Sequence, residues 1–266
     1  MCPILFHVGP LAVHSYGVML MLGFLAGLAL SRRQARRVGL SPDVALDLGV
    51  WILLASIVLA RLLYVGLNWR EYFAHPLDIL GVWREGGLSY FGGLLGGILA
   101  GLIYTRRTHL PFWLLGDVFA PGIALGYAIT RVGCFLNGCC YGTPTSLPWG
   151  VVFPGITTLP SHPTQLYSAA GSLLLTGLLL WLHPRLKAQG QLFAAYLMLY
   201  GVLRGIVEIF RLGVSAEELV LGRHHLLLTQ AQFVCVLLLV FGALLFLRLG
   251  RRGAPNPLRA APRKAR

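Results

Sequence analysis

Three arginines lie inside long apolar stretches of this chain, where a charged side chain is costly. They are Arg61, Arg131 and Arg204. A guanidinium at membrane depth costs about 3 kcal/mol even on the most lenient insertion scale. Glu208 is the only carboxylate near them in the sequence, so an internal ion pair accounts for one arginine at most. Because guanidinium groups match phosphate oxygens in a bidentate manner, the pattern predicts a bound phosphate group.

One of these arginines belongs to a polar stripe on a predicted helix. Tyr200, Arg204 and Glu208 follow one another at i, i+4 and i+8, and Arg211 falls within the same stripe. Two interpretations are open. The Arg204–Glu208 pair serves only to let the helix insert, or the stripe lines a polar cavity in which Glu208 orients an arginine or exchanges protons.

Glycines are unusually dense in the segment GGLSYFGGLLGG, residues 86–97. Glycine permits close approach of two membrane helices. It also permits a bent backbone that brings N–H groups to a ligand. Both interpretations are open, and the second makes Gly92 and Gly93 candidates for contact with a ligand.

The elements that position these residues are predicted to be membrane-spanning helices. The chain has 266 residues, of which 56% are hydrophobic and only 12% are charged, whereas a soluble domain carries about 25% charge. The fold class is therefore all-α, a polytopic integral membrane protein. Spans of about 20 apolar residues can be placed seven times, at 14–30, 45–67, 88–104, 112–134, 164–182, 190–211 and 227–248.

The distribution of basic residues predicts the orientation of these spans. Lys and Arg collect in four segments: 32–37, 106–107, 185–187 and 248–266. With seven spans all four lie on one side, so we expect the N-terminus outside and the C-terminus inside. Residues 1–249 form a single transmembrane domain, and residues 250–266 are expected to be a basic, disordered cytoplasmic tail. The net charge of +13 reflects topology, and no nucleic-acid partner is expected.

This orientation gathers polar side chains toward the outer leaflet in all seven spans. Tyr and His at such positions often anchor a helix at the interface, but the buried arginines need another explanation. Asp117 lies toward the inner end of its span and is not expected to pair with them. The outer half therefore carries excess positive charge, and the anion site is predicted there.

Three cysteines lie in the block TRVGCFLNGCCYG, residues 130–142. They are Cys134, Cys139 and Cys140, and they fall near the outer face, where disulfides can form. A disulfide, free thiols packed as small apolar groups, and a redox or acyl-carrying role all remain open. A metal site needs more ligands and the block holds no histidine, so we expect no metal and no cofactor.

Seven short segments form an ordered set along most of the chain. They are HSYG at 14–17, ARLLY at 60–64, GGLSYFGG at 86–93, RVGCFLNGCCYG at 131–142, PWGVVFP at 148–154, HPTQLY at 162–167 and YGVLRGIVEIFR at 200–211. In this order they resemble the motifs of the bacterial prolipoprotein diacylglyceryl transferase family. Seven such motifs in the right order are a specific signal.

The resemblance implies a fold and an activity. The family has seven transmembrane helices with the N-terminus outside, which agrees with the topology predicted above. It moves diacylglycerol from phosphatidylglycerol to the sulfur of the lipobox cysteine of a prolipoprotein and releases glycerol phosphate. The implied partners are phosphatidylglycerol, the prolipoprotein lipobox segment and membrane lipids. The implied location is the bacterial inner membrane, which the chain crosses several times.

The resemblance also implies roles for the polar residues. Arg131 and Arg204 would hold the phosphate and stabilise its departure, and Glu208 would support Arg204. These three are the implied catalytic residues. The implied contacts to headgroup or substrate are Tyr16, Arg61, Gly92, Gly93, Asn137, Gly138, Gln165, Tyr200 and Arg211.

The chain departs from the family pattern at positions that bear on the thiol. The histidine of the family motif G-G-M-S-F-H-G-G falls on Phe91, and the acidic residue of N-G-E falls on Cys139. A thiol with a pKa near 8.5 then lacks an evident base. Glu208 is the remaining candidate, or the field of the arginines lowers the thiol pKa directly. His162 precedes a proline at a helix start, so we expect it to cap that helix.

Two other functions remain open. The first is a paralogue on the same scaffold that uses another lipid or acceptor, as the replacements at Phe91 and Cys139 suggest. The second is a phospholipid-binding or transport protein without chemistry. Against the second, no charges in the inner half mark a pathway through the membrane, and no inverted repeat is visible.

Overall fold

The computed structural model describes residues 1–8, 11–74, 87–211 and 229–260. Two short strands, β1 (Ile4–Val8) and β2 (Leu11–His14), pair antiparallel at the N-terminus. The long helices are α1 (Ser15–Arg37), α2 (Pro42–Leu67), α5 (Tyr90–Thr108), α6 (Phe112–Asn137), α7 (Thr164–Leu182), α8 (Gln191–Ile209) and α9 (Gln230–Arg252). The short ones are α3 (Trp69–Ala74), α10 (Pro257–Ala260) and the 3-10 turn η2 (His183–Arg185).

The long helices lie where hydropathy predicts the seven spans, with ends that differ by a few residues. Six of them are long and apolar enough to cross a membrane, so the protein is a multi-pass membrane protein that is mostly helical. Helix α5, the glycine-rich one, is not among the six. A seventh crossing and the orientation of the chain therefore stay predictions. The hairpin β1–β2 was not predicted, because strands of four and five residues leave no periodic signal.

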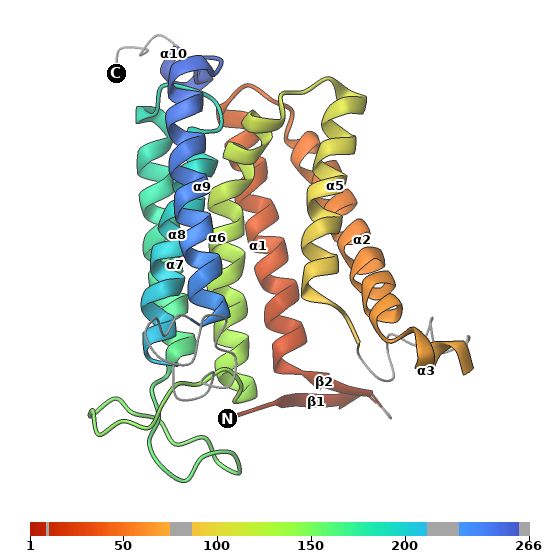
Figure 1. The fold of residues 1–266 in the computed structure, drawn as a ribbon, viewed down its shortest axis with the longest axis vertical. Helices are drawn as coiled ribbons and strands as arrows, with labels where there is room; N and C mark the ends of the chain where they lie inside the picture. The colour runs from red at the N-terminus through yellow and green to blue at the C-terminus, as the bar shows by residue number, and fades with distance from the viewer. Residues whose placement is uncertain (9–10, 75–86, 212–228, 261–266) are drawn as a thin grey trace.

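Small residues set the closest helix contacts. Helix α1 lies against α6 through Gly27 and Gly122, and a Cβ built on Gly122 would be 2.4 Å from the Gly27 carbonyl oxygen. Helix α5 lies against α2 in the same way, since a Cβ on Gly92 would be 2.4 Å from the Leu59 carbonyl oxygen. Glycine at such positions lets backbones approach and gain van der Waals contact in the membrane. In Figure 1 the α2–α5 pair stands beside α1, and α6 to α9 form the rest of the bundle.

A buried carboxylate fixes the start of α8. Asp117 of α6 is 2% exposed and accepts hydrogen bonds from the backbone N–H groups of Gly190 (2.6 Å) and Phe193 (2.8 Å). It thereby satisfies donors that every helix N-terminus leaves unpaired. The expectation that Asp117 does not pair with the arginines is confirmed, since its partners are at the start of α8.

The expectation of a disordered tail from residue 250 is wrong for the part that the structure describes. Residues 250–252 complete α9, Gln189 N–H donates to the Ala254 carbonyl at 2.8 Å, and α10 follows. Asn256 is 2% exposed, and its amide donates to the carbonyls of His183 (2.7 Å) and Leu186 (3.1 Å). These distant acceptors hold the segment in place, while residues 261–266 lie outside the described part.

The long connection between α6 and α7 lies at the end of the bundle that also carries the N-terminal hairpin (Figure 1). Backbone hydrogen bonds link its two arms, for example from Val151 N–H to the Ser161 carbonyl (3.0 Å). Phe153 is fully buried and stacks on Tyr141, with ring centroids 5.1 Å apart. The connection is therefore folded through its own hydrogen bonds and a buried ring, rather than an open loop.

Candidate functional site

The end of helix α6 places the first two cysteines against each other. Gly138, with φ +76°, takes the left-handed conformation that ends the helix. Its N–H donates to the Phe135 carbonyl and Cys139 N–H donates to the Cys134 carbonyl, both at 3.1 Å. This pair of hydrogen bonds is the Schellman motif, which brings the third residue from the helix end close to the second residue beyond it. Those two positions are Cys134 and Cys139.

The third cysteine is held by residues at the start of α7. Cys140 has φ +64°, which is uncommon outside glycine. Its carbonyl accepts from the Thr164 hydroxyl at 2.7 Å, and the Cys139 carbonyl accepts from the Gln165 amide at 2.6 Å. Thr164 and Gln165 are both almost fully buried. Two buried side chains therefore fix the backbone of both adjacent cysteines.

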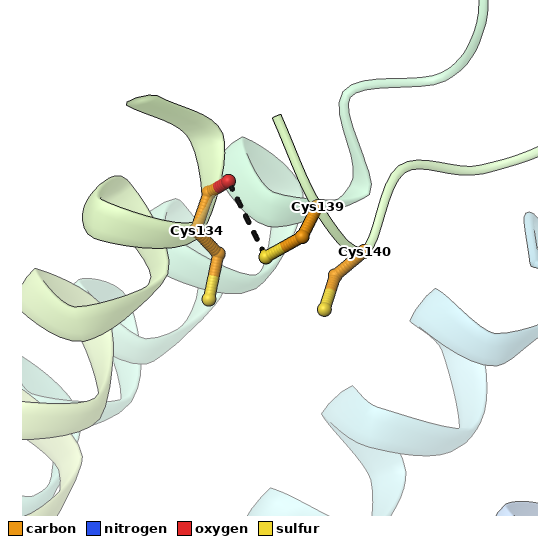
Figure 2. A group of neighbouring side chains, drawn as sticks. All are labelled: Cys134, Cys139 and Cys140. Atoms are coloured by element: carbon orange, nitrogen blue, oxygen red, sulfur yellow. Dashed lines mark hydrogen bonds between the residues drawn. The ribbon is translucent and has the colours of Figure 1, made fainter. Parts of the chain in front are cut away.

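The three sulfur atoms converge as a result. They lie within 4.8 Å of one another, and Figure 2 shows the side chains of Cys134, Cys139 and Cys140 gathered around one point. Cys139 Sγ lies 3.7 Å from the Cys134 carbonyl oxygen. All five cysteines of the chain are free thiols, so of the arrangements that the sequence left open the structure has the thiol cluster, not a disulfide.

The thiols beyond the helix differ in their acidity. Hydrogen bonds from the Cys134 and Cys139 thiols, aided by the charges of Arg131 and Arg211, hold the pKa of Cys140 below its ordinary value despite burial. Burial raises the pKa of Cys139, although a hydrogen bond from the Asn137 side chain opposes this. Cys140 is therefore the sulfur that most readily carries negative charge.

Arg131 and the polar stripe of α8 meet through aromatic rings. The Arg131 guanidinium lies over the Tyr127 ring, 4.7 Å from its centroid, and Tyr127 packs edge-to-face on Tyr200 at 5.5 Å. Tyr200 in turn stacks on Tyr196. Tyr127 was missed by sequence reasoning, although its position four residues before Arg131 puts it on the same helix face.

The stripe of α8 carries more positive than negative charge. Glu208 is 2% exposed and forms an ion pair with Arg204, while Arg211 Nη1 lies 3.9 Å from the same carboxylate. Two guanidiniums thus share one carboxylate. Arg211 Nε is buried and has no hydrogen-bond partner in the described part of the chain. Among the same residues Arg131 pairs with no carboxylate, so the excess positive charge predicted from the sequence is present.

The remaining predicted residues divide into two groups. Tyr16 is the second residue of α1, at the cysteine end, where its Cα would lie 3.4 Å from a Cβ on Gly133 of α6. Gln165 is fully buried, and its side-chain oxygen has no hydrogen-bond partner among the described residues. Asn137 and Gly138 form the end of α6 beside the cysteines. These four residues lie at the thiol cluster.

The second group lies on the α2–α5 pair. Arg61 is buried, donates to the Gly87 carbonyl at 3.0 Å and has its guanidinium 5.1 Å from the Tyr72 ring centroid. Gly92 serves close packing against α2, whereas a Cβ on Gly93 would meet only ordinary contacts. Phe91 is 69% exposed. The structure therefore gives Gly92 the packing role that the sequence left open.

His162 does not cap helix α7 as expected. The cap residue of α7 is Pro163, and no side chain caps the helix. His162 Nδ1 instead lies 3.1 Å from the Tyr167 hydroxyl oxygen, and that oxygen accepts a hydrogen bond from the Trp149 indole N–H at 2.8 Å. His162 belongs to an aromatic group that attaches the α6–α7 connection to α7.

Comparison with known proteins gives a consistent result. The family model described as prolipoprotein diacylglyceryl transferase matches residues 3–248. A phosphatidylglycerol–prolipoprotein diacylglyceryl transferase from Aromatoleum aromaticum is 39% identical over 90% of this chain and 92% of its own length. Proteins of the same name from Synechococcus elongatus (38% identical, 91% of this chain and 85% of the relative) and from a Nostoc species (34%, 97% and 94%) are also similar.

Proposed function

The chain belongs to the prolipoprotein diacylglyceryl transferase family, and we propose that it moves the diacylglyceryl group of phosphatidylglycerol to the lipobox cysteine of a prolipoprotein. It is a transferase of lipoprotein biosynthesis. Within the site, one observation supports the proposal. Guanidinium groups outnumber carboxylates around Arg131, Arg204 and Arg211.

The chemistry needs those cations at the leaving group. The lipobox thiolate attacks the glycerol carbon that carries the phosphoester, a C–S bond forms and the C–O bond breaks. The electron pair of the broken bond stays on the oxygen of the departing glycerol phosphate. Charge grows on that phosphate in the transition state, and preorganised donors aimed at growing charge are an effective form of catalysis. Arg131 and Arg204 supply such donors.

Glu208 acts in this proposal by positioning arginines. Its carboxylate is engaged by Arg204 and lies near Arg211, so it fixes two long side chains that have many rotamers. The same contacts leave it poorly placed to take a proton from an incoming thiol. Of the roles that the sequence left open, these ion pairs support orientation of arginines over proton exchange.

Tyr200 and Gln165 are two further polar side chains of the proposed site. Tyr200 supports the ring under Arg131, and the Gln165 side-chain oxygen is a buried acceptor that an N–H group of substrate can satisfy. Tyr16, Asn137 and Gly138 lie at the same end of the bundle and are proposed to contact headgroup or peptide. The chain acts in the bacterial inner membrane, with this end toward the outer leaflet.

Complementation tests the proposal. The chain is expressed in bacteria depleted of their own diacylglyceryl transferase, together with Arg131→Ala and Arg204→Ala. Arg251→Ala, an exposed arginine at the end of α9, is the matched control. Growth rescue by the wild type and the control, lost in both site variants, is the expected result. Membrane-inserted protein that neither rescues growth nor modifies a lipobox peptide in detergent with phosphatidylglycerol would favour the paralogue on the same scaffold.

A further inference from the structure

The cysteine cluster has no part in the mechanism described so far, and the incoming thiol has no base. Glu208 is engaged by Arg204 and lies near Arg211, so it is poorly placed to take the proton of that thiol. The thiolate, and not the thiol, is the nucleophile in sulfur chemistry. Beyond the field of the arginines, a group that removes the proton from the lipobox thiol would therefore assist the reaction.

The geometry points to three sulfurs acting together. The Schellman motif places Cys134 against Cys139, and the hydrogen bonds from Thr164 and Gln165 hold Cys140 beside them. A disulfide uses two sulfurs and would not require the third. The left-handed backbone of Cys140 is conformationally costly, and such a residue persists only where its surroundings enforce it. The Schellman motif and the hydrogen bonds from Thr164 and Gln165 thus bring three thiols to one point.

A set of three cysteine sulfurs suits zinc. Thiolates are soft ligands that select zinc over magnesium or calcium. Ligands about 2.3 Å from a tetrahedral zinc lie about 3.8 Å from one another, so sulfurs within 4.8 Å need to close by only about 1 Å. Catalytic zinc sites have three protein ligands and keep the fourth position for water or substrate, whereas structural sites are closed by four.

We propose that Cys134, Cys139 and Cys140 bind a zinc ion whose fourth position takes the thiol of the lipobox cysteine. The inference rests on the proposed function and departs from the expectation, made from sequence, that the block has too few ligands. A thiol that coordinates zinc loses its proton, which passes to water. The bound thiolate then attacks the glycerol carbon, and the product is a neutral thioether that leaves the metal. No oxidant or reductant is required.

The position of the cluster fits this role. Cys134 lies one helical turn after Arg131 on α6, so the thiol and the phosphate would meet on one helix face. Thr143, just beyond the cluster, is bound through its N–H to the Phe210 carbonyl at 2.9 Å, next to Arg211. Nucleophile and leaving group are thereby held by adjacent parts of one site.

Metal content is the first test. Protein purified in detergent under reducing conditions with added Zn²⁺ is expected to hold about one zinc per chain by mass spectrometry. The variants Cys134→Ser, Cys139→Ser and Cys140→Ser are expected to lose it. Cys2→Ser and Cys235→Ala, at cysteines outside the cluster, are the matched controls and should keep it. Absence of zinc from the wild type, or unchanged zinc in the cluster variants, would overturn the proposal.

Cobalt tests the open position. The wild type reconstituted with Co²⁺ should show sulfur-to-cobalt charge-transfer absorption, and a lipobox peptide should change this spectrum. The same peptide with serine in place of its cysteine should leave it unchanged. A spectrum that changes with neither peptide would mean a closed structural site and would overturn the role in thiol activation. This readout does not depend on catalytic turnover, so it distinguishes failure of the zinc site from failure of the proposed transferase function.

Activity completes the test. Stripping the wild-type protein with a chelator should lower transfer to the lipobox peptide about 100-fold or more, and Zn²⁺ should restore it. This arm needs no substitution and so avoids variants that fail to fold. Full activity after removal of the metal would contradict the proposal. So would full activity of protein in which peptide mass spectra show a disulfide between cluster cysteines.

Discussion

Among single residues, Glu208 is the carboxylate that two arginines share. It is the buried carboxylate between Arg204 and Arg211, and its removal would leave both guanidiniums without a counter-charge in a site of low dielectric constant. The i, i+4 and i, i+3 spacing made these contacts predictable from sequence. What spacing could not show is that Glu208 is almost fully buried, which makes each contact stronger than at a surface.

Replacement of Glu208 by Gln is predicted to lower the transfer rate about 100-fold while the protein still inserts. The amide keeps the shape of the side chain but has no negative charge with which to hold two arginines. Steady-state kinetics with phosphatidylglycerol and a lipobox peptide measures this, with Gln232→Glu in the first turn of α9 as a control for a charge-changing exchange elsewhere. A Glu208→Gln enzyme with wild-type rate would show that the arginines position themselves without it.

At the scale of elements, the site depends on helices whose relative placement is fixed far from it. Asp117 and Gly122, both on α6, determine how α8 and α1 lie against that helix. Arg131 and the cysteines are on the same helix, so these contacts also set where the site residues stand. Hydropathy predicted every long helix, but it could not predict which pairs touch, because a Gly inside an apolar run contributes the same signal wherever it faces.

Asp117→Ala is predicted to destabilise the protein by about 2 kcal/mol or more. The change leaves the backbone N–H groups of Gly190 and Phe193 without their acceptor at the buried start of α8. Thermal unfolding in detergent measures the loss. Asp47→Ala, which removes an exposed carboxylate from α2, should leave the midpoint nearly unchanged. Equal midpoints for both variants would contradict the capping role of Asp117.

Gly122→Ala tests the contact between α1 and α6. The added Cβ would lie 2.4 Å from the Gly27 carbonyl oxygen, so the two backbones must separate, at a cost of about 1–3 kcal/mol. Reduced yield of folded protein and a lower thermal midpoint are expected. Gly177→Ala makes the same chemical change in α7 where the new Cβ meets nothing within 4 Å, and should be neutral or slightly stabilising.

At the scale of the whole molecule, sequence reasoning succeeded where the signal is carried by many residues. Composition and hydropathy indicated a polytopic helical protein, and seven ordered motifs indicated its family. It failed where one distant contact decides the outcome. Asn256 holds the start of the tail through carbonyls about 70 residues earlier in the chain, and Thr164 holds Cys140 across the α6–α7 connection. Side chains that bind a remote backbone leave no periodic or compositional pattern.

The proposed reaction depends on the topology of the chain. The lipobox thiol must reach the cysteine end of the bundle from outside the membrane. In Figure 1 the N-terminal hairpin and α10 lie at opposite ends of the bundle. An odd number of crossings would put these termini on opposite sides, which requires α5 to cross as well. A membrane-impermeant maleimide added to intact spheroplasts should therefore label the exposed Cys2 and spare a cysteine introduced by Arg259→Cys in α10. Labelling of both positions would mean that α5 does not cross, and labelling of the second alone would invert the predicted orientation.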